Sequence, residues 1–165
     1  MAKNYGVAAI VAALCLVGVV HCVECLTVEG PVYCDTCRVD FPTPLSYDLK
    51  GAKVKVECRN KTTNEVTVSI EGATDGFGWY RIPVEGDHEE ELCEVSLLDS
   101  GDETCSELLE GAVHNARVAL TNRNGISHQT ARFASSLGYA TKEPHANCTK
   151  VLLEMGVLPP DFFNN

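Results

Sequence analysis

Two cysteines near the front of the chain restrict its fold more than any other feature. Cys34 and Cys37 lie three residues apart at the end of an extended run that begins near Leu26. In a strand this spacing separates their Cα atoms by about 10 Å, beyond the limit of about 7 Å for a disulfide, and turns their side chains to opposite faces. Each cysteine therefore needs a partner elsewhere, and we expect two crosslinks to leave one strand end in different directions.

The first 22 residues have the pattern of a secretory signal peptide. Lys3 is their only charged side chain, residues 7–20 form an apolar run, and Cys22 offers a small residue at the cleavage position, with Val20 two before it. A membrane span needs about 20 apolar residues, whereas this run is shorter and has no basic flank after it. We therefore expect residues 1–22 to be removed and residues 23–165 to form one exported domain, without membrane insertion.

The exported part is acidic and rich in cysteine. Without Lys3 it carries 12 basic and 23 acidic side chains, a formal net charge of −11, which disfavours binding to nucleic acid, pectin-like polyanions and anionic membranes. An even set of cysteines in an exported chain of this size is typical of a disulfide framework. The retention of Cys25 stays open, because cleavage just after it would remove it. The remaining six are Cys34, Cys37, Cys58, Cys93, Cys105 and Cys148.

Short segments in which apolar and polar residues alternate predict an all-β fold. Turn-forming residues separate these segments, and Asn124-Gly125 between two of them is typical of a hairpin. We therefore expect an antiparallel sandwich or barrel of about seven strands, of the immunoglobulin or transthyretin type. The segments are residues 26–34, 52–58, 66–71, 79–84, 93–98 and 116–121, with a weaker one at 129–133.

The C-terminal part contains the one segment that looks helical, residues 149–155. Asn147 is placed to cap its start and Gly156 to end it. Pro159 and Pro160 then stop regular structure, and we expect residues 161–165 to be loose.

The alternation pattern also favours one disulfide. Cys58 and Cys93 each lie on the apolar face of an expected strand, so both side chains should point into the core. Six cysteines allow about 15 connectivities. On these grounds, the order in which Cys34 and Cys37 pair with the two later cysteines stays open.

Residues 29–38 carry a resemblance that covers the whole exported chain. Their sequence, Glu-Gly-Pro-Val-Tyr-Cys-Asp-Thr-Cys-Arg, matches at each defined position the Glu-Gly-x-Val-Tyr-Cys-Asp-Thr-Cys-Arg signature of the Ole e I family. This family comprises olive-type pollen allergens and includes anther-specific late pollen proteins. The match continues at residues 51–52, 56–59, 74–76, 86–88, 93–95, 124–126, 142–144 and 148.

The resemblance implies both a disulfide pattern and a role. The implied bridges are Cys34–Cys105, Cys37–Cys148 and Cys58–Cys93. The implied role is that of a secreted protein of pollen or anther, an allergen without enzymatic activity or cofactor. Such a protein supports pollen hydration, germination or tube growth by binding extracellular partners, either receptor ectodomains or cell-wall components. Two features depart from the family: Ser135-Ser136 replaces the usual Asn-Pro, and Cys25 has no counterpart.

Redox and metal chemistry are weakly supported by the sequence. A redox Cys-x-x-Cys pair sits at a helix N-terminus, but Pro42 and Pro44 follow Cys37 too closely for a helix to begin there. A zinc site would need a second ligand pair at close spacing, and the later cysteines are single. The acidic residues 87–91 lack the alternating oxygen ligands and the glycine of a calcium-binding EF-hand. We therefore expect neither a cofactor nor a metal.

Two further functions remain as alternatives. A secreted hydrolase or nuclease would need an acid/base pair in a cleft, and the four exported histidines belong to no catalytic motif. A sugar- or lipid-binding module would need a cavity of several hundred Å³ lined by apolar and aromatic groups, and the chain has few aromatic residues to spare. The histidines are His88, His114, His128 and His145.

Three residues stand out as candidates for modification or contact. Asn60 opens an Asn-Lys-Thr glycosylation sequon in an expected hairpin loop, where it should be accessible. Asn147 opens a second sequon, whose middle residue, Cys148, is expected in a disulfide near the domain body, so we expect modification at Asn60 first. Trp79 should face the opposite side of its strand from the core residue Tyr80, and we expect it to contact a partner.

Overall fold

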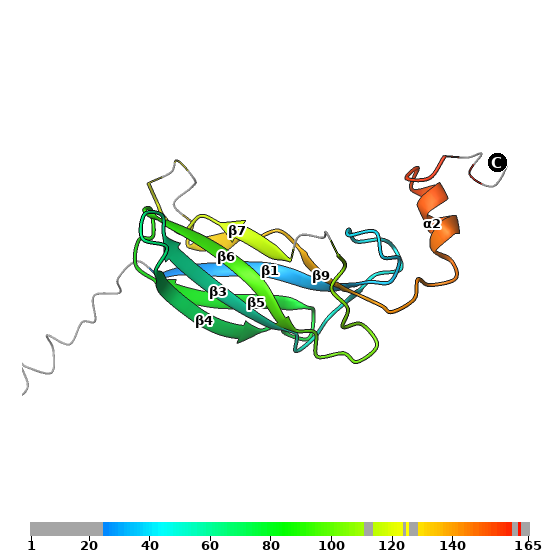
Figure 1. Cartoon of the computed structure of the whole chain (residues 1–165), viewed down its shortest axis with the longest axis horizontal. Coiled ribbons are helices and arrows are strands. Elements are labelled where there is room, and N and C mark those ends of the chain that lie inside the picture. Colours follow the sequence, from blue (N-terminus) through cyan, green and yellow to red (C-terminus); the bar gives the residue numbers. More distant parts are fainter. Residues whose placement is uncertain (1–24, 111–113, 124, 126–128, 160–161, 163–165) are drawn as a thin grey trace, which may run out of the picture.

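The computed structural model describes residues 25–110, 114–123, 125, 129–159 and 162, and it contains two β-sheets and a short helix, α2 (Figure 1). The mostly β class expected from the sequence is confirmed. The expected signal peptide and most of the expected loose tail lie outside the described residues. Within them, no helix is long and apolar enough to cross a membrane.

The first sheet has five strands and is built around β1 (Cys25–Asp35). On one side β1 pairs antiparallel with β2 (Tyr47–Asp48) and β5 (Trp79–Glu85). On the other side it pairs parallel with β8 (Ala131–Phe133) and β9 (Leu137–Ala140). This 11-residue strand is therefore bordered by four others.

The second sheet has four antiparallel strands in the order β4-β3-β6-β7. Its central pair is β3 (Lys53–Asn60) and β6 (Glu91–Asp99), and its edges are β4 (Val66–Ala73) and β7 (Asn115–Val118). Figure 1 shows this sheet lying over β1 and β5. The core fills the space between the two sheets.

Two topological expectations were wrong. Asn124 of the expected Asn124-Gly125 turn lies outside the described residues, but β7 and β8 do not form the expected hairpin, because β7 lies in the four-stranded sheet and β8 in the five-stranded sheet. The fold is also not purely antiparallel, since β8 and β9 run parallel to β1.

Along the strands, every second side chain points inward, and these inward side chains form the core between the two sheets. On β1 the inward residues are buried from Leu26 to Cys34, including Gly30. Gly30 is required there because a Cβ at this position would lie 2.7 Å from Cζ of Tyr80, which is fully buried on β5. The largest fully buried side chains are Leu26, Val28, Val32, Asp35, Leu49, Val54, Val56, Tyr80, Val84, Val95, Leu120 and Leu137.

The end of β1 is organised by a buried acid. The strand stops at Asp35, so Cys37 lies in the following turn rather than in the extended run that the sequence indicated. The Asp35 carboxylate accepts hydrogen bonds from the backbone N–H groups of Cys37 at 3.0 Å, Val39 at 2.7 Å and Asp40 at 2.7 Å. Three donors on one carboxylate fix the turn and thereby the direction of the Cys37 side chain.

Helix α2 (Cys148–Glu154) projects from one end of the sandwich (Figure 1). Only Cys148 and Leu152 are buried among its residues. The expected side-chain cap at Asn147 was wrong, since no such hydrogen bond forms. The expected end at Gly156 is present, because this residue has φ of 72° and its N–H donates to the carbonyl of Leu153 at 3.0 Å.

Candidate functional site

Three disulfides connect the elements of the fold. They join Cys34 to Cys105, Cys37 to Cys148 and Cys58 to Cys93, which are the pairs that the family resemblance implied. Cys34 and Cys37 are bonded to different partners, so the structure gives them no Cys-x-x-Cys redox bond. Among the described residues, Cys25 is the free cysteine, and it lies half-buried at the start of β1.

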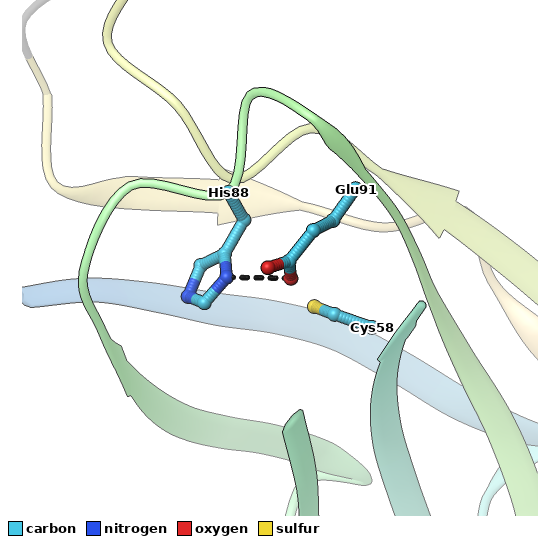
Figure 2. Close-up of side chains that lie close together, drawn as sticks. All are labelled: Cys58, His88 and Glu91. Atoms are coloured by element: carbon cyan, nitrogen blue, oxygen red, sulfur yellow. Dashed lines mark hydrogen bonds and ion pairs between the residues drawn. The ribbon is translucent and has the colours of Figure 1, made fainter. Parts of the chain in front are cut away.

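One group of three side chains in the described residues has metal-ligand types in close range, as Figure 2 shows. The ligand atoms of Cys58, His88 and Glu91 lie within 4.8 Å of one another. The sulfur of Cys58 is bonded to Cys93, however, and the thiolate that metals bind is therefore not available in this oxidised form. The group offers a metal one imidazole and one carboxylate, which is too few ligands for a structural zinc site.

His88 is held on both sides of its ring. Nδ1 lies 2.8 Å from Oε2 of Glu91 and Nε2 lies 3.0 Å from the carbonyl oxygen of Glu85. Its backbone N–H donates to the carbonyl of Leu120 at 2.9 Å. These contacts tie the β5–β6 loop to the segment after β7.

A cleft of about 540 Å³ lies beside this pair, lined by His88, Glu91, Cys93 and residues 117–121. A histidine–glutamate pair in a cleft is the arrangement that general acid/base catalysis would use. Here both ring nitrogens already face oxygen atoms of the protein. The observed contacts therefore assign the pair a structural role in bracing the loop.

The outer side of the five-stranded sheet carries an exposed phenylalanine together with a half-buried tryptophan and proline. Register places Trp79 on β5 opposite Pro31 on β1, and Phe133 on β8 opposite Glu29 on β1. Phe133 is 65% exposed, and the burial pattern of each strand puts these residues on the solvent side. We call Glu29, Pro31, Trp79, Arg81 and Phe133 the outer aromatic face.

Ion pairs fix the polar part of this face. Arg81 lies across from Glu29, with Nε 3.5 Å from Oε2, and its Nη1 is 2.9 Å from Oδ2 of Asp75. The backbone N–H groups of Phe77 and Trp79, followed by Arg81, hold the pKa of Asp75 below its usual value. Asp75 thus orders the turn before β5, and Phe77 at its tip is 78% exposed.

The sequence identified only part of this face. Trp79 was expected from its parity, and the structure places it half-buried on the outward side of β5. Phe133 was not identified. The residues on its two sides, Arg132 and Ala134, are both buried, and this inverts the usual assignment of arginine to the surface and phenylalanine to the core.

The two glycosylation sequons lie in different surroundings. Asn60 ends β3, and its side-chain oxygen accepts hydrogen bonds from the N–H groups of Thr62 at 2.9 Å and Thr63 at 3.0 Å. Thr62 is exposed. Asn147 is exposed as well, but Cys148 is buried in a disulfide at the start of α2.

Comparison with known proteins identifies the family. Residues 24–156 match the family described as "Pollen protein Ole e 1 like". The chain belongs to this family. The Ole e 1-like resemblance indicated by residues 29–38 is thereby confirmed.

Curated relatives align over most of this Ole e 1-like chain. An Olee1-like protein of Betula pendula is 46% identical over 154 residues, which are 90% of this chain and 92% of the relative. The anther-specific protein LAT52 of Solanum lycopersicum is 42% identical, over 98% of this chain and 100% of its own length. Pollen allergen Che a 1 of Chenopodium album is 44% identical, over 94% and 95% respectively.

A solved structure shares the Ole e 1-like fold. The major plantain pollen allergen Pla l 1 superposes with a TM-score of 0.67 at 34% identity, covering 75% of this chain and 99% of the allergen. Apart from the Olee1-like protein, these relatives are named as an anther-specific protein and as pollen allergens, and none of the four names describes an enzyme.

Proposed function

We propose that this protein is secreted and acts as a disulfide-braced interaction protein, without catalysis of its own, in pollen or anther. Its role would be to support pollen hydration, germination or tube growth by binding an extracellular partner. As a member of a family with several pollen allergens, it would also be an allergen itself.

The outer aromatic face carries this proposal. Phe133 at 65% exposure, Trp79 and Pro31 form an apolar surface bordered by the Arg81–Glu29 ion pair. Aromatic and arginine side chains on a rigid surface are the residue types that dominate binding energy at protein interfaces. The fold that presents them is crosslinked by three disulfides, so little ordering would accompany binding.

Charge favours a partner with a basic surface. The exported chain has a formal net charge of −11, and attraction between oppositely charged surfaces speeds association and is screened by salt. The face itself pairs its charges internally, and the acidic loops around it would supply the long-range attraction. A receptor ectodomain with a basic binding surface fits these properties, and a cell-wall component is the second class of partner.

Secretion is supported by the sequence pattern of residues 1–22 and by the disulfides. Three disulfides in a chain of this length are typical of an oxidising compartment. Proteins kept in the reducing cytosol rarely hold such bonds.

The test is partner capture with matched variants. The secreted, oxidised product would be immobilised and exposed to extracellular and membrane extracts of pollen and pistil, and captured partners would be identified and their affinities measured. Combining Trp79→Ala with Phe133→Ala should weaken the affinity at least about tenfold, the loss expected for central aromatic contacts. Leu98→Ala removes a side chain of 45% exposure from the other sheet and should leave affinity unchanged.

Two outcomes would overturn the proposal. Equal affinity of the double variant and the parent protein would remove the outer aromatic face as the binding site. Hydrolysis of a wall polymer or RNA by the pure protein, abolished by His88→Ala, would instead make the cleft beside His88 and Glu91 an active site.

A further inference from the structure

The side chains drawn in Figure 2 come together from three parts of the chain. Cys58 lies on β3, His88 in the loop between β5 and β6, and Glu91 at the start of β6. Their ligand atoms lie within 4.8 Å of one another, and Cys93, two residues after Glu91, is bonded to Cys58. Before the chain is oxidised, both cysteines are thiols. The same group then contains two thiols, one imidazole and one carboxylate.

The hydrogen bonds of His88 direct one ring nitrogen toward this group. Nε2 lies 3.0 Å from the carbonyl oxygen of Glu85, which can only accept, so Nε2 carries a proton. In a neutral imidazole the other nitrogen, Nδ1, then has a lone pair. Nδ1 lies 2.8 Å from Oε2 of Glu91, and an ionised carboxylate is also only an acceptor. Two electron-rich atoms thus face each other, and a cation between them, either a proton or a metal ion, relieves their repulsion.

The groups behind these side chains are those that support a metal site. A metal-bound histidine usually donates its other ring N–H to a carbonyl or a carboxylate, and the carbonyl of Glu85 occupies this position. The carboxylate of Glu91 accepts a hydrogen bond from the hydroxyl of Thr67 on β4 at 2.6 Å. Its backbone N–H donates to the carbonyl of His88 at 3.1 Å. Both side chains are therefore held in place from outside the group.

The ligand types and the spacing fit zinc. Four-coordinate Zn²⁺ binds thiolate sulfur at about 2.3 Å and imidazole nitrogen or carboxylate oxygen at about 2.0–2.2 Å, so neighbouring ligand atoms lie about 3.3–3.8 Å apart. Shifts of about 1 Å would close the observed group to this size. His88, Glu91 and Cys93 line the cleft of about 540 Å³, which gives the ion a path to enter. Zinc would also hold the two sulfur atoms about 3.8 Å apart, so zinc binding and the disulfide exclude each other.

We propose that Cys58 and Cys93, before they form their disulfide, bind one Zn²⁺ together with Nδ1 of His88 and the carboxylate of Glu91. The two thiol protons leave as the ion binds. Exchange with a donor disulfide then forms the Cys58–Cys93 bond: the two thiolates give two electrons to the donor, which takes up two protons and becomes two thiols, and Zn²⁺ is released. The ion thus keeps this pair together, and away from the other cysteines, until it is oxidised. This inference concerns the maturation of the chain and goes beyond the partner binding proposed above.

The experiment uses the whole exported chain, residues 23–165, reduced and kept free of oxygen, with Co²⁺ alone and Zn²⁺ alone as probes. Tetrahedral Co²⁺ with thiolate ligands absorbs in the visible and the near ultraviolet, and one ion per chain should give these bands. Zn²⁺ should displace the Co²⁺. Oxidised glutathione should then release one Zn²⁺ per chain to a chelating dye and form the Cys58–Cys93 bond, identified by mass spectrometry of a digest.

Paired cysteine variants separate this site from the other thiols. Cys58→Ala with Cys93→Ala should abolish the cobalt–thiolate band. Cys34→Ala with Cys105→Ala, which removes another buried disulfide pair, should keep it.

Single variants test the other two ligands and the group that holds one of them. His88→Gln and Glu91→Gln should each weaken Co²⁺ and Zn²⁺ binding at least about tenfold, and Thr67→Val, which removes the hydroxyl that contacts Glu91, about tenfold. His145→Gln changes an exposed histidine before α2 and should leave the affinity unchanged.

Absence of the cobalt–thiolate band from the reduced parent chain would overturn the inference, whether or not that chain keeps its β-sheet circular dichroism. Retention of the band in Cys58→Ala with Cys93→Ala, or its loss in Cys34→Ala with Cys105→Ala, would assign it to other thiols. Equal affinity of His88→Gln and the parent chain would remove the histidine from the site. None of these results bears on the outer aromatic face, which is tested separately in the oxidised protein.

Discussion

Cys58 and Cys93 face each other directly across β3 and β6, with Cα atoms 4.0 Å apart and the His88–Glu91 pair packed beside them (Figure 2). This bond crosslinks the two central strands of the four-stranded sheet, where both residues are buried. It joins residues 35 positions apart.

Replacing this pair together, Cys58→Ala with Cys93→Ala, should lower the free energy of unfolding by about 4 kcal/mol, from the entropy that the crosslink removes from the unfolded chain. Urea denaturation of the oxidised proteins measures the difference. An unchanged denaturation midpoint would show that the bond does not form in the oxidised parent protein.

Tyr80→Phe should stabilise the protein or leave its stability unchanged. The hydroxyl of Tyr80 is fully buried and has no hydrogen-bond partner among the described residues, and such a group costs about 1–3 kcal/mol. Thermal unfolding of this variant, with Tyr47→Phe as the exposed control, tests the expectation. A clear loss of stability in Tyr80→Phe alone would indicate a buried water bound to the hydroxyl.

Gly30→Ala should be destabilising by about 1–3 kcal/mol, the usual cost of overpacking a core. The added methyl group would lie 2.7 Å from Cζ of Tyr80, the residue directly opposite Gly30 in the pairing of β1 with β5. Chemical denaturation checks this, with Gly76→Ala as the control because a Cβ at Gly76 meets nothing within 4 Å. Equal stability of the two variants would contradict the packing described for β1 and β5.

Asp35→Ala should cost about 2–4 kcal/mol, because three backbone N–H groups lose their acceptor in a largely buried turn. Asp48→Ala changes an exposed carboxylate nearby and should alter stability by less than about 0.5 kcal/mol. Hydrogen exchange would locate the effect at Cys37, Val39 and Asp40. Protection factors that stay unchanged at these amides would rule out the capping role of Asp35.

Stability should fall at alkaline pH because of buried tyrosines. Burial raises the pKa of Tyr33 and Tyr139 to about 12 from the ordinary value of 10.0, and it raises the pKa of Tyr80 as well. A raised pKa stabilises the folded state fully below about pH 10, and this contribution is lost as the pH rises through about 12. Tyrosinate absorbance and circular dichroism should therefore change together in this window. Phenol ionisation well below it, with the fold intact, would contradict the burial.

The sequence predicted the strands better than their connections. Alternation located the long strands because each buries one face, as in Val54, Val56 and Cys58 of β3. It missed β2, with two residues, and β9, with four, since such lengths show no clear period. The parallel pairing of β8 and β9 with β1 depends on contacts between residues about a hundred positions apart, and no local pattern encodes them.

Arg132 explains the part of the candidate site that sequence reasoning missed. This arginine is 3% exposed, and its Nη2 donates to the carbonyl of Thr121 at 3.1 Å and also to the side chain of Asn122. Since these partners hold the cation inside, Phe133 faces solvent.

Because β1 lies in the middle of the five-stranded sheet, this sheet can form fully only when the late strands of the chain have been synthesised. As the first of the described strands to be synthesised, it needs β8 and β9, the last strands of the chain, along its second edge. Cys34 and Cys37 likewise cannot form the disulfides of the folded protein until residues 105 and 148 have been translated. The sheet therefore closes late in synthesis, and a chain that ended before β8 would leave one edge of β1 unpaired and Cys34 and Cys37 without the partners that they have in the folded protein.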